Sequence, residues 1–148
     1  MANNLNLLNT AVVRRVCNAI IDHLNNNCDI VPEGLYFDYQ ALPKGVGFSI
    51  QDLPQAVKLK VYMDEETYIG QYSFTIFYNA FADASSDRKN ETAVLDNICD
   101  WLGHNKPEVD EHITINYIRQ LYNTKPFAQL ENGIITYQTE MTVNFNKF

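Results

Sequence analysis

Residues 68–81, YIGQYSFTIFYNAF, and residues 135–145, ITYQTEMTVNF, decide the fold of this chain. In both stretches a large side chain recurs at every second position, which is the period of a β-strand. Most large side chains of 68–81 are even-numbered and would share one face of a sheet, whereas Phe77 and Phe81 would face the other way. The partner face of 135–145 is mostly polar, so we expect an antiparallel sheet with one solvated side.

Shorter alternating stretches predict further strands around this pair. The charged run Asp64-Glu65-Glu66-Thr67 joins one of them to 68–81, so the two strands predict a long β-hairpin with a charged tip. Residues 124–132 predict a connecting loop that ends in the turn dipeptide Asn132-Gly133. The shorter predicted strands are 35–40, 46–51, 57–63 and 113–121.

Two helices are predicted, at 5–25 and 86–103, because their apolar residues recur at steps of three and four. Asn25-Asn26-Asn27 ends the first helix and Gly103 ends the second. No regular strand–helix–strand repeat occurs, which excludes a doubly wound parallel sheet. We therefore expect an α+β fold with a single antiparallel or mixed sheet, a long hairpin and two helices on one face, as one domain over 1–148.

The charge pattern disfavours binding to nucleic acid or to an anionic membrane. The chain has 148 residues and a formal net charge of −7, and its 11 lysines and arginines are scattered rather than gathered on one element. No apolar run approaches the roughly 20 residues that a membrane-spanning helix needs. The N-terminus lacks the features of a signal peptide. We expect a soluble protein that is made in the cytoplasm.

The sequence contains no recognisable catalytic or metal-binding motif. Cys17, Cys28 and Cys99 are widely spaced and odd in number, which is typical of reduced thiols. The three histidines have no metal-ligand spacing. No serine has the flanking glycines of a nucleophile elbow, and no phosphate-binding glycine loop occurs. We predict no catalytic residues, no metal, no cofactor and no enzymatic activity.

Protein contacts are the remaining prediction. The acidic tip Asp64, Glu65 and Glu66 would project from the hairpin, and Phe127 and Leu130 are apolar residues in an otherwise polar loop. Edge strands would also offer unpaired backbone groups to a neighbouring subunit. We name these five residues as candidates for protein contacts.

Three stretches of the chain resemble the tail terminators, or minor capsid proteins, of siphophages of Gram-positive bacteria, with the lambda tail terminator as a more distant relative by architecture. They are the ribbon-forming residues 57–64 and 68–77, the helix 90–102 that ends in Trp101-Leu102, and the closing strand 133–145. The resemblance is one of pattern and order, and it covers most of the chain from residue 5 onward.

The resemblance implies a concrete role. Members of this family form hexameric rings on the last ring of the tail tube, stop its polymerisation and present a surface to head-completion or connector proteins, while DNA passes through the lumen. The acidic charge of this chain suits a passage to which DNA does not stick. The resemblance implies no catalytic residue and no membrane partner, and it places the protein in the virion, at the head–tail interface, after assembly in the host cytoplasm.

Two other functions remain open at this point. One is a small-molecule-binding or isomerase-like α+β domain, which would need polar groups converging in an apolar cavity. The other is an adaptor or inhibitor that binds another protein by strand addition. The adaptor would be a monomer, so its mass in solution would distinguish it from a ring.

Overall fold

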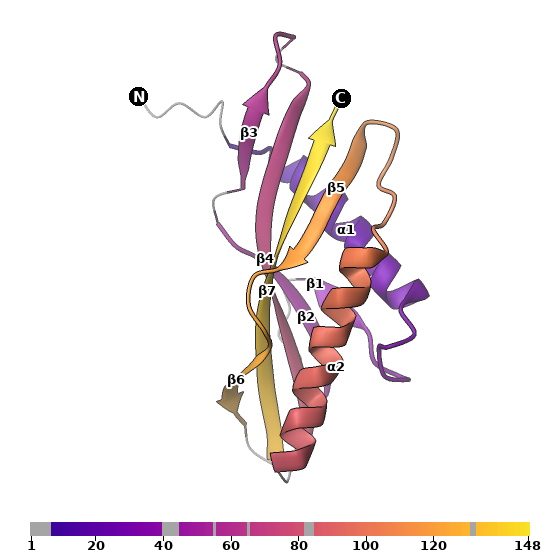
Figure 1. The fold of residues 1–148 in the computed structure, drawn as a ribbon, viewed down its shortest axis with the longest axis vertical. Coiled ribbons are helices and arrows are strands. Elements are labelled where there is room, and N and C mark those ends of the chain that lie inside the picture. The colour runs from indigo at the N-terminus through magenta and orange to yellow at the C-terminus, as the bar shows by residue number, and fades with distance from the viewer. Residues whose placement is uncertain (1–6, 40–44, 55, 65, 82–84, 131–132) are drawn as a thin grey trace.

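A long two-stranded ribbon forms the centre of the molecule (Figure 1). The computed structural model describes residues 7–39, 45–54, 56–64, 66–81, 85–130 and 133–148. Strand β4 (Tyr68–Phe81) and strand β7 (Ile134–Lys147) pair antiparallel over all 14 residues of each, from Tyr68↔Lys147 to Phe81↔Ile134. These are the two stretches that the sequence predicted to be decisive, and both are confirmed as strands.

The neighbours of the ribbon change halfway along its length (Figure 1). In one half, β3 pairs with β4 and β5 pairs with β7, both antiparallel. In the other half, β2 pairs with β4 and β6 pairs with β7, again antiparallel, and β1 pairs with β2. The bounds are β1 Phe37–Tyr39, β2 Gly47–Asp52, β3 Val57–Val61, β5 Ile113–Gln120 and β6 Lys125–Gln129.

The structure decides one expectation about the sheet and corrects two others. The β1–β2 pair is parallel while the other pairs are antiparallel, so of the antiparallel and mixed sheets that the sequence left open, the seven-stranded sheet is the mixed one. Residues 124–132 are not all loop, because 125–129 form β6. The long partner of β4 is β7, whereas β3 covers only the first few residues of β4, and Glu65 in the turn between them lies outside the described residues.

The two predicted helices are present, with shifted bounds. Helix α1 (Thr10–Asn27) starts later than predicted because the side chain of Asn9 accepts a hydrogen bond from the backbone N–H of Ala11 (2.8 Å) and caps the helix. Of the preceding residues, Leu8 packs beside the core and Leu5 lies outside the described residues. Helix α2 (Ser85–His104) extends one residue beyond the prediction at each end.

Both helices contact the face of the ribbon that carries the even-numbered residues of β4. Cys17 of α1 and Tyr72 of β4 are both buried in the shared core, and Tyr78 of β4 donates a hydrogen bond to Glu91 of α2. Side chains from α1, α2 and the sheet form one continuous buried core, as the expected packing of two helices on one face requires. Its largest fully buried members include Tyr72, Phe74, Tyr137 and Phe145.

Candidate interaction surfaces

The charged tip between β3 and β4 is organised by the side chain of Asp64. Its carboxylate accepts hydrogen bonds from the hydroxyl of Thr67 (2.7 Å) and from the backbone N–H groups of Thr67 (2.8 Å) and Glu66 (3.1 Å). These hydrogen bonds, that of the Thr67 hydroxyl first, lower the pKa of Asp64. Asp64 thus stabilises its own turn, while Glu66 is exposed. That Asp64, Glu65 and Glu66 contact a partner stays a prediction.

An apolar surface beside this tip was missed by the sequence reasoning. We call residues 57–63 the β3 arm; four of its large apolar side chains are exposed. The alternation of Leu59, Val61 and Met63 predicted a strand, but alternation does not reveal whether anything covers the face. The exposed fractions are 55% for Leu59, 38% for Val61, 43% for Tyr62 and 103% for Met63.

Phe127 and Leu130 lie at the other end of the ribbon, on β6 and just after it (Figure 1). Both are exposed, and the ring of Phe127 lies 5.5 Å from that of Phe77 on β4. Phe81, exposed by 58%, is paired with Ile134, whose carbonyl accepts a hydrogen bond from the Leu130 N–H (2.7 Å). We call Phe77, Phe81, Phe127 and Leu130 the aromatic end patch.

The predicted contact residues therefore form two groups rather than one site. β6 pairs with β7 around Tyr137, which lies opposite Tyr78, whereas the tip precedes Tyr68. Ten residues of strand separate these positions, which corresponds to roughly 33 Å at about 3.3 Å per residue. The structure brings Phe127 and Leu130 to one end of the ribbon and Asp64 and Glu66 to the other.

The sheet face opposite the helices is polar and mostly uncharged. Its side chains hydrogen-bond to one another across the strands: Tyr117 donates to Gln71 (3.1 Å), Asn116 to Asn144 (2.8 Å), and Thr136 to Asn79 (2.6 Å). Ser73 and Thr142 make a further pair at 3.2 Å. We call this surface the open face; on β7 its only charged side chain between Thr136 and Asn146 is Glu140.

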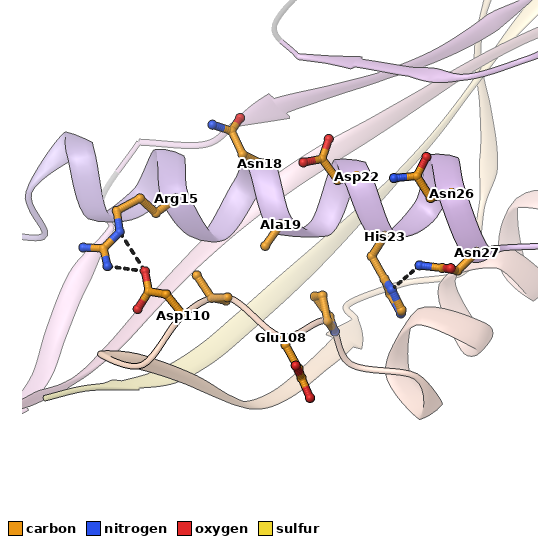
Figure 2. A pocket seen from close by; sticks show the side chains of 11 residues that line it. Arg15, Asn18, Ala19, Asp22, His23, Asn26, Asn27, Glu108 and Asp110 are labelled. Atoms are coloured by element: carbon orange, nitrogen blue, oxygen red, sulfur yellow. Dashed lines mark hydrogen bonds and ion pairs between the residues drawn. The ribbon is translucent and has the colours of Figure 1, made fainter.

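A shallow polar groove of about 450 Å³ runs between α1 and residues 107–110 (Figure 2). At one end, Nε of Arg15 donates to Asp110 (3.0 Å) and forms an ion pair with it. At the other end, His23 hydrogen-bonds to the backbone oxygen of Asn105 (2.7 Å). Burial, the largest single influence, would raise the pKa of Asp110, but the hydrogen bonds from Arg15 and from the backbone N–H of His112, together with the Arg15 charge, outweigh it and lower that pKa. Both ends of the groove tie α1 to the segment after α2.

On the opposite side of residues 106–111 lies a second groove, of about 640 Å³, against strand β5. We call it the β5 groove. Its apolar lining includes Pro107 and Ile115, which are buried, and Val109, which is half-buried. Glu108 and Glu111 are exposed at its rim, and Figure 2 shows Glu108 pointing away from α1.

The buried thiols are held in their neutral form. Burial raises the pKa of the Cys17 thiol to about 12, and it also raises the pKa of the Cys99 and Cys28 thiols. A protonated thiol is a poor nucleophile and a poor metal ligand. All three cysteines are unpaired and buried, so the prediction of reduced thiols acting as small apolar side chains is confirmed.

The described part of the chain contains neither a metal-binding cluster nor a helix that could span a membrane. No three His, Cys, Asp or Glu side chains among the described residues gather closely enough to hold a metal ion. Neither α1 nor α2, as far as their residues are described, is both long and apolar enough to cross a membrane.

The fold has a counterpart among the solved structures. No protein-family profile and no curated protein matches the chain. Among solved structures, a chain of the virion of a native gene transfer agent particle has a similar fold, with a TM-score of 0.64 and 14% sequence identity. The match covers 93% of this chain and 99% of that chain. At this identity the likeness shows a shared fold.

Proposed function

We propose that this chain is a virion structural protein and, more narrowly, the tail terminator of a long-tailed bacteriophage. The observation that carries the proposal is the fold shared over nearly the full length of both chains with a component of a gene transfer agent virion, a phage-like particle. The resemblance of residues 57–77, 90–102 and 133–145 to tail terminators supports the same role from the sequence. The protein acts by binding other proteins, not by catalysis.

The two ends of the ribbon suit a protein that sits between two partners. A terminator contacts the tail tube on one side and a head-completion or connector protein on the other. Exposed apolar side chains gather at both ends of the same rigid ribbon: Met63 and its neighbours on the β3 arm, and Phe127 and Leu130 in the aromatic end patch. Exposed apolar clusters of this kind are typical of protein-binding surfaces.

The acidic residues of the tip would add specificity to one of these contacts. Asp64 stabilises the turn that follows the β3 arm, and Glu66 is exposed in this turn. Carboxylates beside an apolar surface favour partners with complementary positive charge and reject others. We assign Asp64, Glu65, Glu66, Phe127 and Leu130 to contacts with other virion proteins.

The charge of the chain suits a ring through which DNA passes. With a net charge of −7, six copies would carry a charge of 6 × −7 = −42. The open face consists mainly of amide and hydroxyl side chains that already bond one another, so it offers few cations to phosphate. A negative net charge and a face with few cations would both leave DNA unbound, and DNA has to stay unbound to pass through the ring.

The test is a phage that lacks this gene. Electron microscopy of its lysate should show abnormally long tails, or filled heads without tails, and expression of the intact chain in trans should restore normal virions. A matched pair of complementing variants sharpens the test: Phe127→Asp should fail to restore normal virions, whereas Lys89→Glu, on the exposed side of α2, should restore them. Normal virions from the deletion strain would refute the proposal.

A further inference from the structure

In the described part of the chain, two outer strands at the same end of the ribbon have no further strand of the sheet on their outer sides. The local strand order is β3, β4, β7, β5, so β3 and β5 are the outer strands (Figure 1). Among the described residues, Leu7 forms an isolated β-bridge with Val57, the first residue of β3. The backbone N–H of Leu8 donates a hydrogen bond to the backbone oxygen of Ala56 (3.0 Å), just before β3. An outer strand with free N–H and C=O groups is a template for pairing with another chain.

The β3 arm is basic and apolar in an otherwise acidic protein. Residues 53–63 contain Lys58 and Lys60 and no carboxylate. The amine of Lys58 lies 4.7 Å from the centre of the Tyr68 ring, and that of Lys60 lies 5.0 Å from that of Tyr62. Both lysine amines therefore lie over tyrosine rings, and neither forms an ion pair with an acidic residue in the described part of the chain.

The β5 groove has the opposite character. Residues 106–111 contain Glu108, Asp110 and Glu111 against the single cation Lys106, whose amine donates to the backbone oxygen of Asn116 (3.1 Å). Asp110 is paired with Arg15. Glu108 has no ion pair among the described residues and is exposed. The groove thus combines an apolar lining with the unpaired carboxylate of Glu108 at its rim, while Glu111 lies 3.3 Å from the ring nitrogen Nε2 of His112.

We propose that the β3 arm of one copy of this chain lies in the β5 groove of the next copy. The exposed side chains of Leu59 and Val61 would contact the apolar lining, and Lys60 would approach Glu108. This inference rests on the ring in the proposed function and names the contact that builds it. The positive charge of the β3 arm complements the carboxylate at the rim of the β5 groove, and the apolar side chains of the arm complement the apolar lining of the groove.

The occupant of the groove has to be a second copy and not the chain's own arm. β4 and β7 lie between β3 and β5, so the two outer strands are about 14 Å apart, at about 4.8 Å per strand, and they face in opposite directions. The contact is therefore heterologous: each copy offers its arm on one flank and its groove on the other. Repeated around an axis, such a contact closes into a ring.

Cross-linking of introduced cysteines tests the contact directly. Leu59→Cys places a thiol on the arm and Thr114→Cys places one in the groove, where Thr114 is exposed. The native cysteines are buried and remain unreactive. With a short bis-maleimide, the double variant should give a ladder from dimer to hexamer, both at high concentration in solution and in purified particles.

Each single-cysteine variant should give no ladder, because the contact then carries a thiol on one side only and a chain with one thiol can be joined to one other chain at most. A second control pairs Leu59→Cys with Leu130→Cys, which lies at the other end of the ribbon, and should also give no ladder. If the Leu59→Cys, Thr114→Cys variant stops at dimers in solution and in particles alike, the proposed contact is wrong.

Charge reversal provides an independent readout. In the double-cysteine background, Lys60→Glu or Glu108→Lys alone should lower the yield of cross-linked oligomers about tenfold, the effect of about 1.4 kcal/mol. Combining them should restore the yield, while the control Lys89→Glu should leave it unchanged. Failure of the combination to restore the ladder would overturn the pairing. Absence of a ladder from the Leu59→Cys, Thr114→Cys variant itself, together with a long-tail phenotype in the deletion strain, would reject this contact and keep the proposed function.

Discussion

The two faces of the β4–β7 ribbon are made of alternate residues of the same strands, yet they differ in composition and in what they contact. The face under the helices carries aromatic and branched side chains such as Tyr72, Phe74 and Phe145, which are almost completely buried. The open face carries mainly Ser, Thr, Asn and Gln side chains that hydrogen-bond across the strands, with Phe77 and Phe81 of the aromatic end patch at one end. Because successive side chains of a strand point to opposite faces, one pair of strands both packs against the helices and presents a mainly polar surface on its other face.

The helix-covered face should provide stability, and the open face is the one available for contacts with the surroundings. Burial of apolar surface is the main favourable contribution to folding, so the helix-covered face should account for most of the stability. The open face satisfies its polar groups within the chain, for example through Thr142, whose hydroxyl donates to the backbone oxygen of Tyr72 (3.3 Å). It can therefore face water, a neighbouring copy or passing DNA without a penalty from unpaired groups.

The largest expected effect comes from removing a ring on the helix-covered face. Phe74 is fully buried, and Phe74→Ala should lower the free energy of unfolding by about 3–5 kcal/mol because it leaves a cavity. The matched control is Phe81→Ala, a side chain of the same type that is exposed by 58% on the other face of the same strand, which should cost less than about 0.5 kcal/mol. Urea denaturation measures both.

Phe74→Ala could leave too little stability for a measurable transition, since domains of this size are stable by only about 5–15 kcal/mol. Phe74→Leu keeps most of the volume and should remain folded with a smaller loss. Equal losses for Phe74→Ala and Phe81→Ala would contradict the division of tasks between the two faces.

A smaller effect is expected where the helix-covered face has no room. A Cβ atom at Gly70 would lie 2.5 Å from Cζ of the Phe145 ring and 3.0 Å from Cδ2 of Leu8. Gly70→Ala should therefore cost about 1–3 kcal/mol through overpacking. Gly45→Ala is the control, because nothing lies within 4 Å of its added Cβ. A neutral Gly70→Ala in thermal unfolding would mean that Phe145 and Leu8 can move aside easily.

The sequence predicted the central strands well because their signal is local. Large side chains occupy most even-numbered positions of 68–81, and β4 has those bounds. The first helix was predicted at 5–25, but the start at Thr10 depends on one side-chain hydrogen bond from Asn9, which periodicity does not reveal. β6 was missed because Pro126 in an exposed segment reads as loop, whereas an edge strand tolerates proline.

The pairing of strands and the candidate site were less predictable for a different reason. Alternation says which residues share a face, but it does not say which strand lies alongside or whether a face is covered. The parallel β1–β2 pair and the β7 partner of β4 were therefore not predicted, nor was the exposure of Leu59 and Met63. Phe127 and Leu130 were selected by residue type, and their exposure is confirmed, while their partners remain a prediction.

The smallest expected effect tests the open face itself. The hydroxyl of Thr136 donates to the side-chain oxygen of Asn79 (2.6 Å) inside the polar network, and both residues are buried. Thr136→Val keeps the shape and removes the donor, so it should lower the free energy of unfolding by about 1 kcal/mol. Thr114→Val, at an exposed position on β5, should change it by less than about 0.5 kcal/mol. The shift of the urea midpoint at constant slope measures both.

The stabilities of Thr136→Val and Thr114→Val together distinguish two reasons for the polar character of the open face. A loss at Thr136 alone would mean that the network stabilises the ribbon as well as keeping charges off the face. If Thr136→Val and Thr114→Val are equally neutral, the network adds nothing to folding, and the polar character has to serve whatever the face meets in the assembled particle. Complementation of the deletion strain by Thr136→Val then separates the two cases, because only the second predicts a defect in virions without a defect in stability.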